Sequence, residues 1–214
     1  WDTQEQTLFA ARDHFGIKPF YYAEEDGRFY YASEQKALYP VLREHSFNKA
    51  ALQDYMTFQY VPEPETLATE IKVLEPGHSL FKKLNQPIEV SRYYDPMFTP
   101  VHQEESEIVK RLHDVLIDSV KIHMRSDVPV GAFLSGGIDS TIVASIAKQF
   151  NTNIKTFSVG FEREGYSELD VAQETAKALN VENYSHVITA EEFMKAFPYF
   201  VWDMDDPLAD PAAV

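Results

Sequence analysis

The sequence predicts an α/β protein built from two unlike parts. Its second half alternates short apolar strands with helices, a pattern typical of parallel βαβ crossovers. Its first part holds strand-like segments joined by turn signals, which predicts an α+β arrangement with hairpins. Residues 96–105 contain Pro96 and Pro100 and then become polar, as expected of a linker. We therefore expect one domain over residues 1–95 and another over residues 106–214.

The first part is expected to contain two hairpins and a capped helix. Asp26-Gly27 predicts the turn of the first hairpin, and Pro76-Gly77 predicts the turn of the second. Asn48 predicts the start of a helix with Leu52, Tyr55 and Met56 on one face. The strand-like segments are residues 8–11, 20–22, 29–32, 71–74 and 79–81.

The second part is expected to alternate regularly. The continuous apolar run at residues 129–134 is typical of a strand buried on both faces. The first helix carries an apolar stripe of Ile108, Leu112, Val115, Leu116 and Val120. Helices are predicted at residues 105–124, 141–150, 168–179 and 191–202, and further strands at residues 156–160 and 186–188.

Composition excludes several classes of function. The 214 residues contain no cysteine, which excludes disulfides, thiolate metal sites and a cysteine nucleophile within the chain. The net charge of −15 repels phosphate backbones and argues against nucleic acid as a partner. No apolar run is long enough to span a membrane, and no secretory signal precedes the first strand. We expect a cytoplasmic protein without a membrane partner.

One motif carries the chemistry: Ser135-Gly136-Gly137-Ile138-Asp139-Ser140, between a predicted strand and a predicted helix. Its two glycines permit close approach to a bulky anion and a positive φ. The helix that follows presents unpaired N–H groups and the positive end of its dipole. The loop contains no lysine or arginine, so the anion would be held by backbone and hydroxyl groups. This arrangement suits a pyrophosphate, whereas the simplest structural alternative is a plain Gly-Gly turn.

The motif resembles the signature of the PP-loop ATP pyrophosphatases, which have an adenine nucleotide alpha hydrolase-like fold. Residues 125–131, Arg-Ser-Asp-Val-Pro-Val-Gly, resemble the asparagine synthetases within that group. Residues 11–22 and 32–38 are similar to the late part of an N-terminal-nucleophile glutaminase domain. Glutamine phosphoribosylpyrophosphate amidotransferases share a similar first string. Together the motifs resemble an interior piece of the B-type, glutamine-hydrolysing asparagine synthetases.

The resemblance implies a parallel, doubly wound ATP-binding domain, and it implies a role for each residue of the motif. In the family, main-chain groups at the positions of Leu134 and Val159 read the adenine base. Asp139 would act through a bridging Mg²⁺, the alternative being that it caps the helix. The implied ATP-binding residues are Leu134, Ser135, Gly136, Gly137, Asp139, Ser140 and Val159, with Asp139 also the metal ligand.

The resemblance also implies what lies outside the chain. The glutaminase nucleophile, a cysteine, is expected upstream of Trp1, so no catalytic residue is assigned to the glutaminase part of this chain. A second ATP-contacting segment is expected beyond Val214. The implied cofactors are ATP and Mg²⁺, the implied substrates are aspartate, glutamine and ATP, and a homodimer is compatible with the family.

The implied activity is ATP-dependent amidation of aspartate to asparagine with ammonia from glutamine. It proceeds through a β-aspartyl-adenylate and releases AMP and pyrophosphate. The alternatives are a β-lactam-synthetase-like ligase acting on another carboxylate, a tRNA-thiolating enzyme and a nucleotide-sensing scaffold with an inactive glutaminase. An acidic cluster near the end of the chain is interpreted first as a solvated surface turn. The other interpretation is that this segment lines an access route for aspartate or ammonia. The cluster consists of Asp203, Asp205, Asp206 and Asp210.

Overall fold

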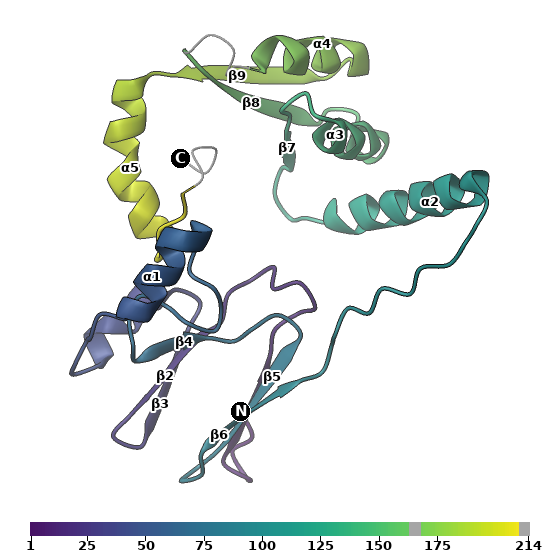
Figure 1. Ribbon diagram of the computed structural model, residues 1–214. Coiled ribbons are helices and arrows are strands. Elements are labelled where there is room, and N and C mark those ends of the chain that lie inside the picture. Colours follow the sequence, from purple (N-terminus) through teal and green to yellow (C-terminus); the bar gives the residue numbers. More distant parts are fainter. Residues whose placement is uncertain (163–167, 210–214) are drawn as a thin grey trace. The chain divides into compact units, whose positions relative to one another are not determined.

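The computed structural model describes residues 1–162 and 168–209. These residues form two compact units, which are considered separately here (Figure 1). The first unit contains residues 1–98 together with residues 196–209, and the second contains residues 99–195. Among the described residues, no helix combines the length and the apolar character needed to cross a membrane.

The first unit contains two three-stranded antiparallel sheets, ordered β1-β5-β6 and β3-β2-β4. The predicted hairpin at Asp26-Gly27 is confirmed, with Glu25 opposite Arg28 across the turn. Both turn residues have positive φ, 52° and 72°, as a tight two-residue hairpin requires. The strands are β1 (Thr7–Ala11), β2 (Tyr21–Glu25), β3 (Arg28–Ala32), β4 (Ile71–Val73), β5 (His78–Lys83) and β6 (Ile88–Arg92).

The second predicted hairpin is wrong. Strand β4 pairs with β2, whereas β5 pairs with β1 and β6, so the Pro76-Gly77 turn carries the chain from one sheet to the other. The Leu74 N–H extends the link to β2 by donating to the carbonyl of Phe20 at 2.8 Å. Strand β6 was not predicted. It pairs along its whole length with β5, and that pairing, rather than a strong pattern of its own, defines it.

The predicted cap of the first helix is confirmed. Helix α1 (Lys49–Phe58) begins after Asn48, whose side chain accepts a hydrogen bond from the Ala51 N–H at 3.1 Å. The expected apolar face is largely exposed, because Met56 is 75% exposed and Leu52 38%, whereas Ala51 is fully buried. Two short 3₁₀ helices precede α1, namely η1 (Gln35–Ala37) and η2 (Tyr39–Val41).

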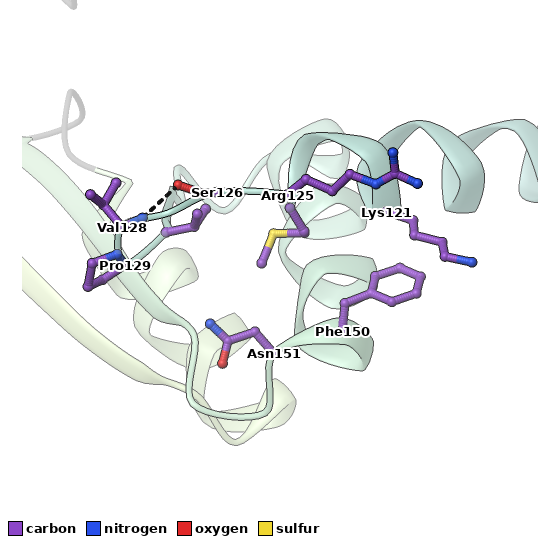
Figure 2. A pocket seen from close by; sticks show the side chains of 9 residues that line it. Lys121, Arg125, Ser126, Val128, Pro129, Phe150 and Asn151 are labelled. Carbon is purple, nitrogen blue, oxygen red and sulfur yellow. Dashed lines mark hydrogen bonds between the residues drawn. The ribbon is translucent and has the colours of Figure 1, made fainter.

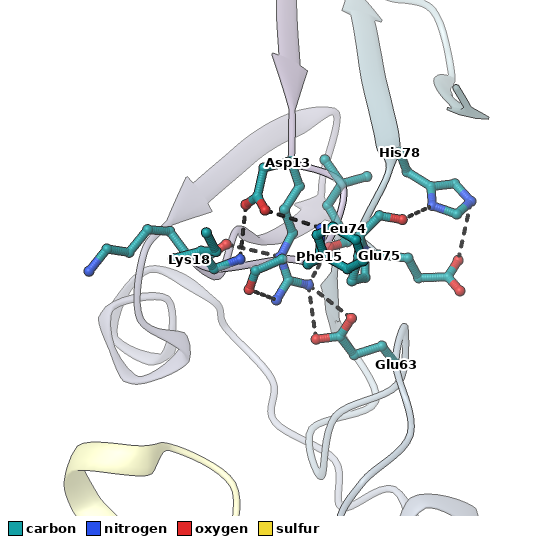
Figure 3. A network of polar contacts seen from close by, with 11 residues as sticks. Asp13, Phe15, Lys18, Glu63, Leu74, Glu75 and His78 are labelled. Atoms are coloured by element: carbon teal, nitrogen blue, oxygen red, sulfur yellow. Dashed lines mark hydrogen bonds and ion pairs between the residues drawn. The ribbon is translucent and has the colours of Figure 1, made fainter. Parts of the chain in front are cut away.

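A buried guanidinium joins the two sheets of the first unit. Arg12 follows β1 and donates to the carbonyl of Leu74, which follows β4, at 2.7 Å. The same side chain donates to both carboxylate oxygens of Glu63 at 2.9 Å and to the carbonyls of Lys18 and Gly16 at 2.9 and 3.0 Å. Figure 3 shows how these groups converge from separate segments. With only 8% of Arg12 exposed, the network satisfies a charge that would otherwise be costly to bury.

The second unit contains the predicted parallel sheet, in the order β7-β8-β9. Helix follows strand along the chain, which confirms the alternation inferred from the sequence. The elements are α2 (Glu105–His123), β7 (Gly131–Phe133), α3 (Ile138–Phe150), β8 (Lys155–Phe161), α4 (Leu169–Leu179) and β9 (Glu182–Ile188). Helix α5 (Ala190–Met204) begins in this unit, and its last residues belong to the first.

One face of this sheet is covered and the other is open. Leu134 packs with Ala144 of α3 and with Ala172 and Ala176 of α4, so both helices lie on the same face. The opposite face carries Phe133, which is 82% exposed. The expectation of a strand buried on both faces is therefore wrong for residues 129–134 as described here. The apolar stripe of α2 is also only partly packed: Val120 is buried, whereas Ile108, Leu112 and Val115 are exposed.

We predict that Arg12→Met destabilises the first unit by about 3 kcal/mol, because it leaves the Glu63 carboxylate and three carbonyls without their donor. The control is Arg43→Met, which removes an exposed ion pair with Asp26 and should cost less than about 0.5 kcal/mol. Urea unfolding of both variants measures the difference. Equal unfolding midpoints would contradict a structural role for Arg12.

Candidate functional site

The motif at residues 135–140 forms a loop between the end of β7 and the start of α3. Gly137 occupies the N-cap position, and the first intrahelical bond runs from the Thr141 N–H to the Gly137 carbonyl at 3.1 Å. The N–H groups of Ile138, Asp139 and Ser140 consequently have no acceptor within the helix. These donors and the helix dipole make the loop a site that favours an anion.

Two hydroxyl groups hold the loop in shape. The Ser135 and Ser140 hydroxyl oxygens lie 3.0 Å apart, and Ser140 Oγ also accepts from the Ser135 N–H at 3.2 Å. The Gly137 N–H donates to Ser135 Oγ at 3.3 Å. These bonds are long and exposed, so phosphate oxygens can replace them at low cost. The loop thus brings together Ser135 and Ser140, which are five residues apart in the sequence.

Position 136 requires glycine. Its φ of +83° lies in the left-handed region, where a side chain is strained. A Cβ built there would lie 2.9 Å from Val171 Cγ1 and 3.0 Å from the Ala172 N atom at the start of α4. The missing side chain lets the loop lie directly against α4.

Asp139 is exposed in the first turn of α3. It is not the N-cap, because Gly137 holds that position, so the interpretation as a capping residue is wrong. Among the described residues, the Asp139 carboxylate makes no hydrogen bond and no ion pair, and no group of three or more acidic or histidine side chains that could hold a metal is found. The helix dipole stabilises a negative charge at this end of a helix. It does so without a hydrogen bond to the carboxylate, whose oxygens stay available to a ligand.

Leu134 and Val159 lie at the carboxyl ends of neighbouring strands. The Leu134 N–H donates to the Phe157 carbonyl at 2.8 Å, which extends the β7–β8 ladder by one residue. Because successive residues of a strand point their backbone groups to alternate sides, Val159 directs its own toward β7 as Phe157 does. The β7–β8 register ends at the Phe133–Phe157 pair, so the backbone groups of Val159 lie beyond the last residue of β7. The sheet thus brings both predicted residues to one edge.

A buried polar ladder beneath the loop was not predicted. Ser158 is 4% exposed, and its hydroxyl donates to the Leu134 carbonyl at 2.6 Å. Asn183 of β9 in turn donates to the hydroxyl oxygens of Ser158 and Thr156, each at 3.0 Å. The signal in the sequence is the alternation of Thr156 and Ser158 with Phe157 and Val159, which places both hydroxyls on the covered face. The ladder fixes the Leu134 carbonyl, one of the groups proposed to face adenine.

The Arg125–Gly131 motif lies elsewhere. Most of it lines a surface pocket of about 320 Å³ with the ends of α2 and α3 (Figure 2). Val130 lies just before β7, and Phe150 and Asn151 lie at the end of α3, so the pocket is at the opposite edge of the sheet from the Ser135–Ser140 loop. The residues that carry this part of the sequence resemblance do not line the loop.

The acidic cluster is not a solvated turn. Asp205 is only 6% exposed, and its carboxylate accepts from the N–H groups of Gln35 and Lys36 at 2.6 and 3.1 Å. Asp206 accepts from the Leu67 N–H at 3.3 Å. Asp203 is exposed, and Asp210 lies outside the described residues. Asp205 and Asp206 hold backbone in place within the first unit, a function that neither interpretation of the sequence had foreseen.

Comparison with known proteins identifies both parts of the chain. Residues 111–214 match the asparagine synthase family, and residues 1–94 match the glutamine amidotransferase domain family. Over its whole length the chain is 51% identical to asparagine synthetase [glutamine-hydrolyzing] 1 of Bacillus subtilis and 44% identical to a putative asparagine synthetase [glutamine-hydrolyzing] of Mycobacterium bovis. It is also 30% identical, over 98% of its length, to amidase chyE of Penicillium rubens. The chain spans about a third, 34%, of each of these relatives.

We predict that Gly136→Ala destabilises the second unit by about 2 kcal/mol or more, through backbone strain and the close contact with α4. Gly27→Ala is the matched control, because Gly27 has a similar φ of +72° and nothing within 4 Å of an added Cβ. The control should cost about 1 kcal/mol, from strain alone. Thermal or urea unfolding compares the two variants. Equal losses would show that α4 readily moves away.

We predict that Asp206 makes the first unit less stable as the pH rises from about 4 to about 6. Burial raises the pKa of Asp206 to about 6, the Leu67 N–H opposes that rise, and the neighbouring Asp205 charge adds to it. The folded state therefore binds the proton more tightly than the unfolded state, and this contribution is lost as the pH passes the folded pKa. Asp206→Asn should flatten the pH dependence by about 2 kcal/mol, measured by urea unfolding at pH 4 and pH 6.5. Asp203→Asn, at an exposed position, should keep the slope of the unchanged protein.

Proposed function

Because the chain belongs to the family of glutamine-hydrolysing asparagine synthetases, we propose that it contributes to the ATP-dependent amidation of aspartate with ammonia from glutamine. The observation that carries the proposal is the Ser135–Ser140 loop, whose free N–H groups at the start of α3 follow directly on β7. The same chain carries an amidotransferase part, which matches the need for a source of ammonia.

The reaction has three steps that together account for every product. Glutamine is hydrolysed to glutamate and ammonia by the amidotransferase part of the whole protein. The side-chain carboxylate of aspartate attacks the α-phosphorus of ATP, and pyrophosphate leaves with the electron pair of the broken P–O bond. Ammonia then attacks the carbonyl carbon of the β-aspartyl-adenylate, loses a proton and expels AMP, which yields asparagine.

The loop acts on the leaving pyrophosphate. The N–H groups of the first turn of α3 and the hydroxyls of Ser135 and Ser140 donate to its oxygens, where negative charge increases during the attack. Because these donors are fixed by the Gly136 backbone and the α4 contact, little reorganisation is needed. Because the loop itself contributes only neutral donors, pyrophosphate can leave afterwards.

The adenine base is proposed to lie at the edge formed by Leu134 and Val159. The Leu134 carbonyl, which already accepts from Ser158, has a second lone pair, and Val159 offers its backbone groups beyond the end of β7. Main-chain recognition leaves both side chains free, and Leu134 uses its own for the core.

Asp139 fits a role as a magnesium ligand. Its carboxylate is exposed at the loop and makes no hydrogen bond or ion pair with other described residues. When bound, Mg²⁺ supplies positive charge between this carboxylate and the polyphosphate, which would otherwise repel each other. Among the described residues Asp139 is the only acidic side chain within the loop, so it is the one side chain there that would hold the ion.

Asp139→Asn in the full-length protein tests this assignment. The change keeps the shape but removes the charge, so we expect aspartate-dependent pyrophosphate release to fall about 100-fold and the Mg²⁺ requirement to weaken. Glutamine hydrolysis should be retained. The control is Asp118→Asn, an exposed position on α2.

Magnesium titrations of pyrophosphate release decide whether Asp139 acts through the metal. Superimposable curves for Asp139→Asn and the unchanged protein would refute the metal-binding role. The same assay identifies the acceptor: pyrophosphate release driven by carboxyethyl-arginine but not by aspartate would instead favour a β-lactam-synthetase-like ligase.

A further inference from the structure

The segment Trp202–Ala209, which we call the latch segment, belongs to two parts of the molecule at once. By sequence it lies within residues 111–214, which match the asparagine synthase family. By contact it packs within the first unit, against residues that match the amidotransferase family. Figure 1 shows the end of α5 beside α1, both in the first unit, and the Ala209 N–H donates to the Gln59 carbonyl after α1 at 3.0 Å.

The centre of this contact is the carboxylate of Asp205. It accepts the Gln35 N–H at 2.6 Å and, on its other oxygen, the Lys36 N–H at 3.1 Å and the Lys36 ammonium at 3.2 Å. The Lys36 ammonium also donates to the Trp202 carbonyl at 2.9 Å and lies 5.6 Å from the centre of the Trp202 ring. Lys36 and Asp205 are 16% and 6% exposed, so water weakens this ion pair less than a surface pair.

The backbone of Asp205 has an unfavourable conformation that the contact stabilises. Its φ is +65°, a conformation that a residue other than glycine seldom adopts. Such a conformation persists only where surrounding contacts compensate for it, and here the compensation comes from Gln35 and Lys36. Asp206 adds a second attachment, because it accepts the Leu67 N–H. The latch segment is thus fastened at η1, after α1 and in the loop before β4.

We propose that Asp205 and Lys36 are positioning residues that fasten the synthase part of the chain to the amidotransferase part, so that ammonia made by one is used by the other. This inference rests on the proposed function. Ammonia that escapes into water near neutral pH is protonated and ceases to be a nucleophile. A fastening between the two parts therefore raises the yield of asparagine per glutamine without contributing to the chemistry at either site.

The test uses the full-length protein with Asp205→Asn or Lys36→Met. Asn keeps an acceptor oxygen but loses the charge, and Met keeps the aliphatic stem of Lys36 while it removes the ammonium. We expect the ratio of glutamate released to asparagine formed to rise about twofold or more. Glutamine hydrolysis and asparagine synthesis from added ammonium chloride should both stay at the level of the unchanged protein. Asp203→Asn, which removes an exposed charge from the same segment, should leave the ratio unchanged.

Hydrogen exchange at the Gln35 and Lys36 amides reports whether the contact has opened. Faster exchange with an unchanged ratio would overturn the proposal, because the contact would then be open without consequence for ammonia use. Unchanged exchange in both variants would also overturn it, since these residues would not maintain the contact. A wild-type protein that makes no asparagine even from ammonium chloride would instead refute the proposed function, a result separate from either outcome.

Discussion

Buried cations link the two sheets of the first unit. Arg12 follows the last residue of β1, and its guanidinium reaches the Leu74 carbonyl just after β4, in the other sheet. The hydrophobic cluster of this unit, built around Ala23, Leu38, Leu42, Ala68 and Ile71, packs on the β2–β4 sheet and does not include the β1–β5–β6 sheet. Polar contacts therefore help to set how these two sheets meet, through Arg12 and through Lys82 of β5, which donates to the Glu24 carboxylate of β2 at 2.6 Å. The same guanidinium fixes Glu63, so it also positions the loop that leads to Leu67, where the latch segment binds.

The Ser135–Ser140 loop, for which we propose an anion-binding role, contains no cationic side chain. In a protein with a net charge of −15, a polyphosphate meets general repulsion, and only local dipoles and a metal ion oppose it. The unpaired N–H groups of the first turn of α3 supply the dipoles. The close approach of Gly136 to α4 and the buried polar ladder of Ser158 and Asn183 supply rigidity. Under the proposed function, affinity for the nucleotide is expected to depend on the metal, because no lysine or arginine in the loop replaces it.

The sequence predicted those elements whose conformation depends only on residues that are close together in the chain. The Asp26-Gly27 turn, the Asn48 cap and the strand–loop–helix around Gly136 are each determined by neighbours in the chain, and each was predicted. Strand β6 and the separation of β4 from β5 arise from pairing with distant strands, which a turn signal such as Pro76-Gly77 does not reveal. The same limit applies to Asp205: its partners Gln35 and Lys36 lie 170 and 169 residues away, and nothing in the pattern of four aspartates distinguishes a buried carboxylate from a solvated one.

The division of the sequence into two families does not coincide with the division of the structure into two units. Residues 196–209 match the synthase family but belong to the first unit. The chain therefore leaves the first unit after residue 98 and returns to it at residue 196, whereas a single boundary near residue 98 accounts only for the first of these passages. An amidotransferase part exchanged between two relatives would carry Gln35 and Lys36 but leave Asp205 behind. Recombination at the linker therefore preserves this contact only when the two parents have compatible residues on both sides of it. The two parts of the chain are consequently expected to evolve as a pair rather than as independent modules.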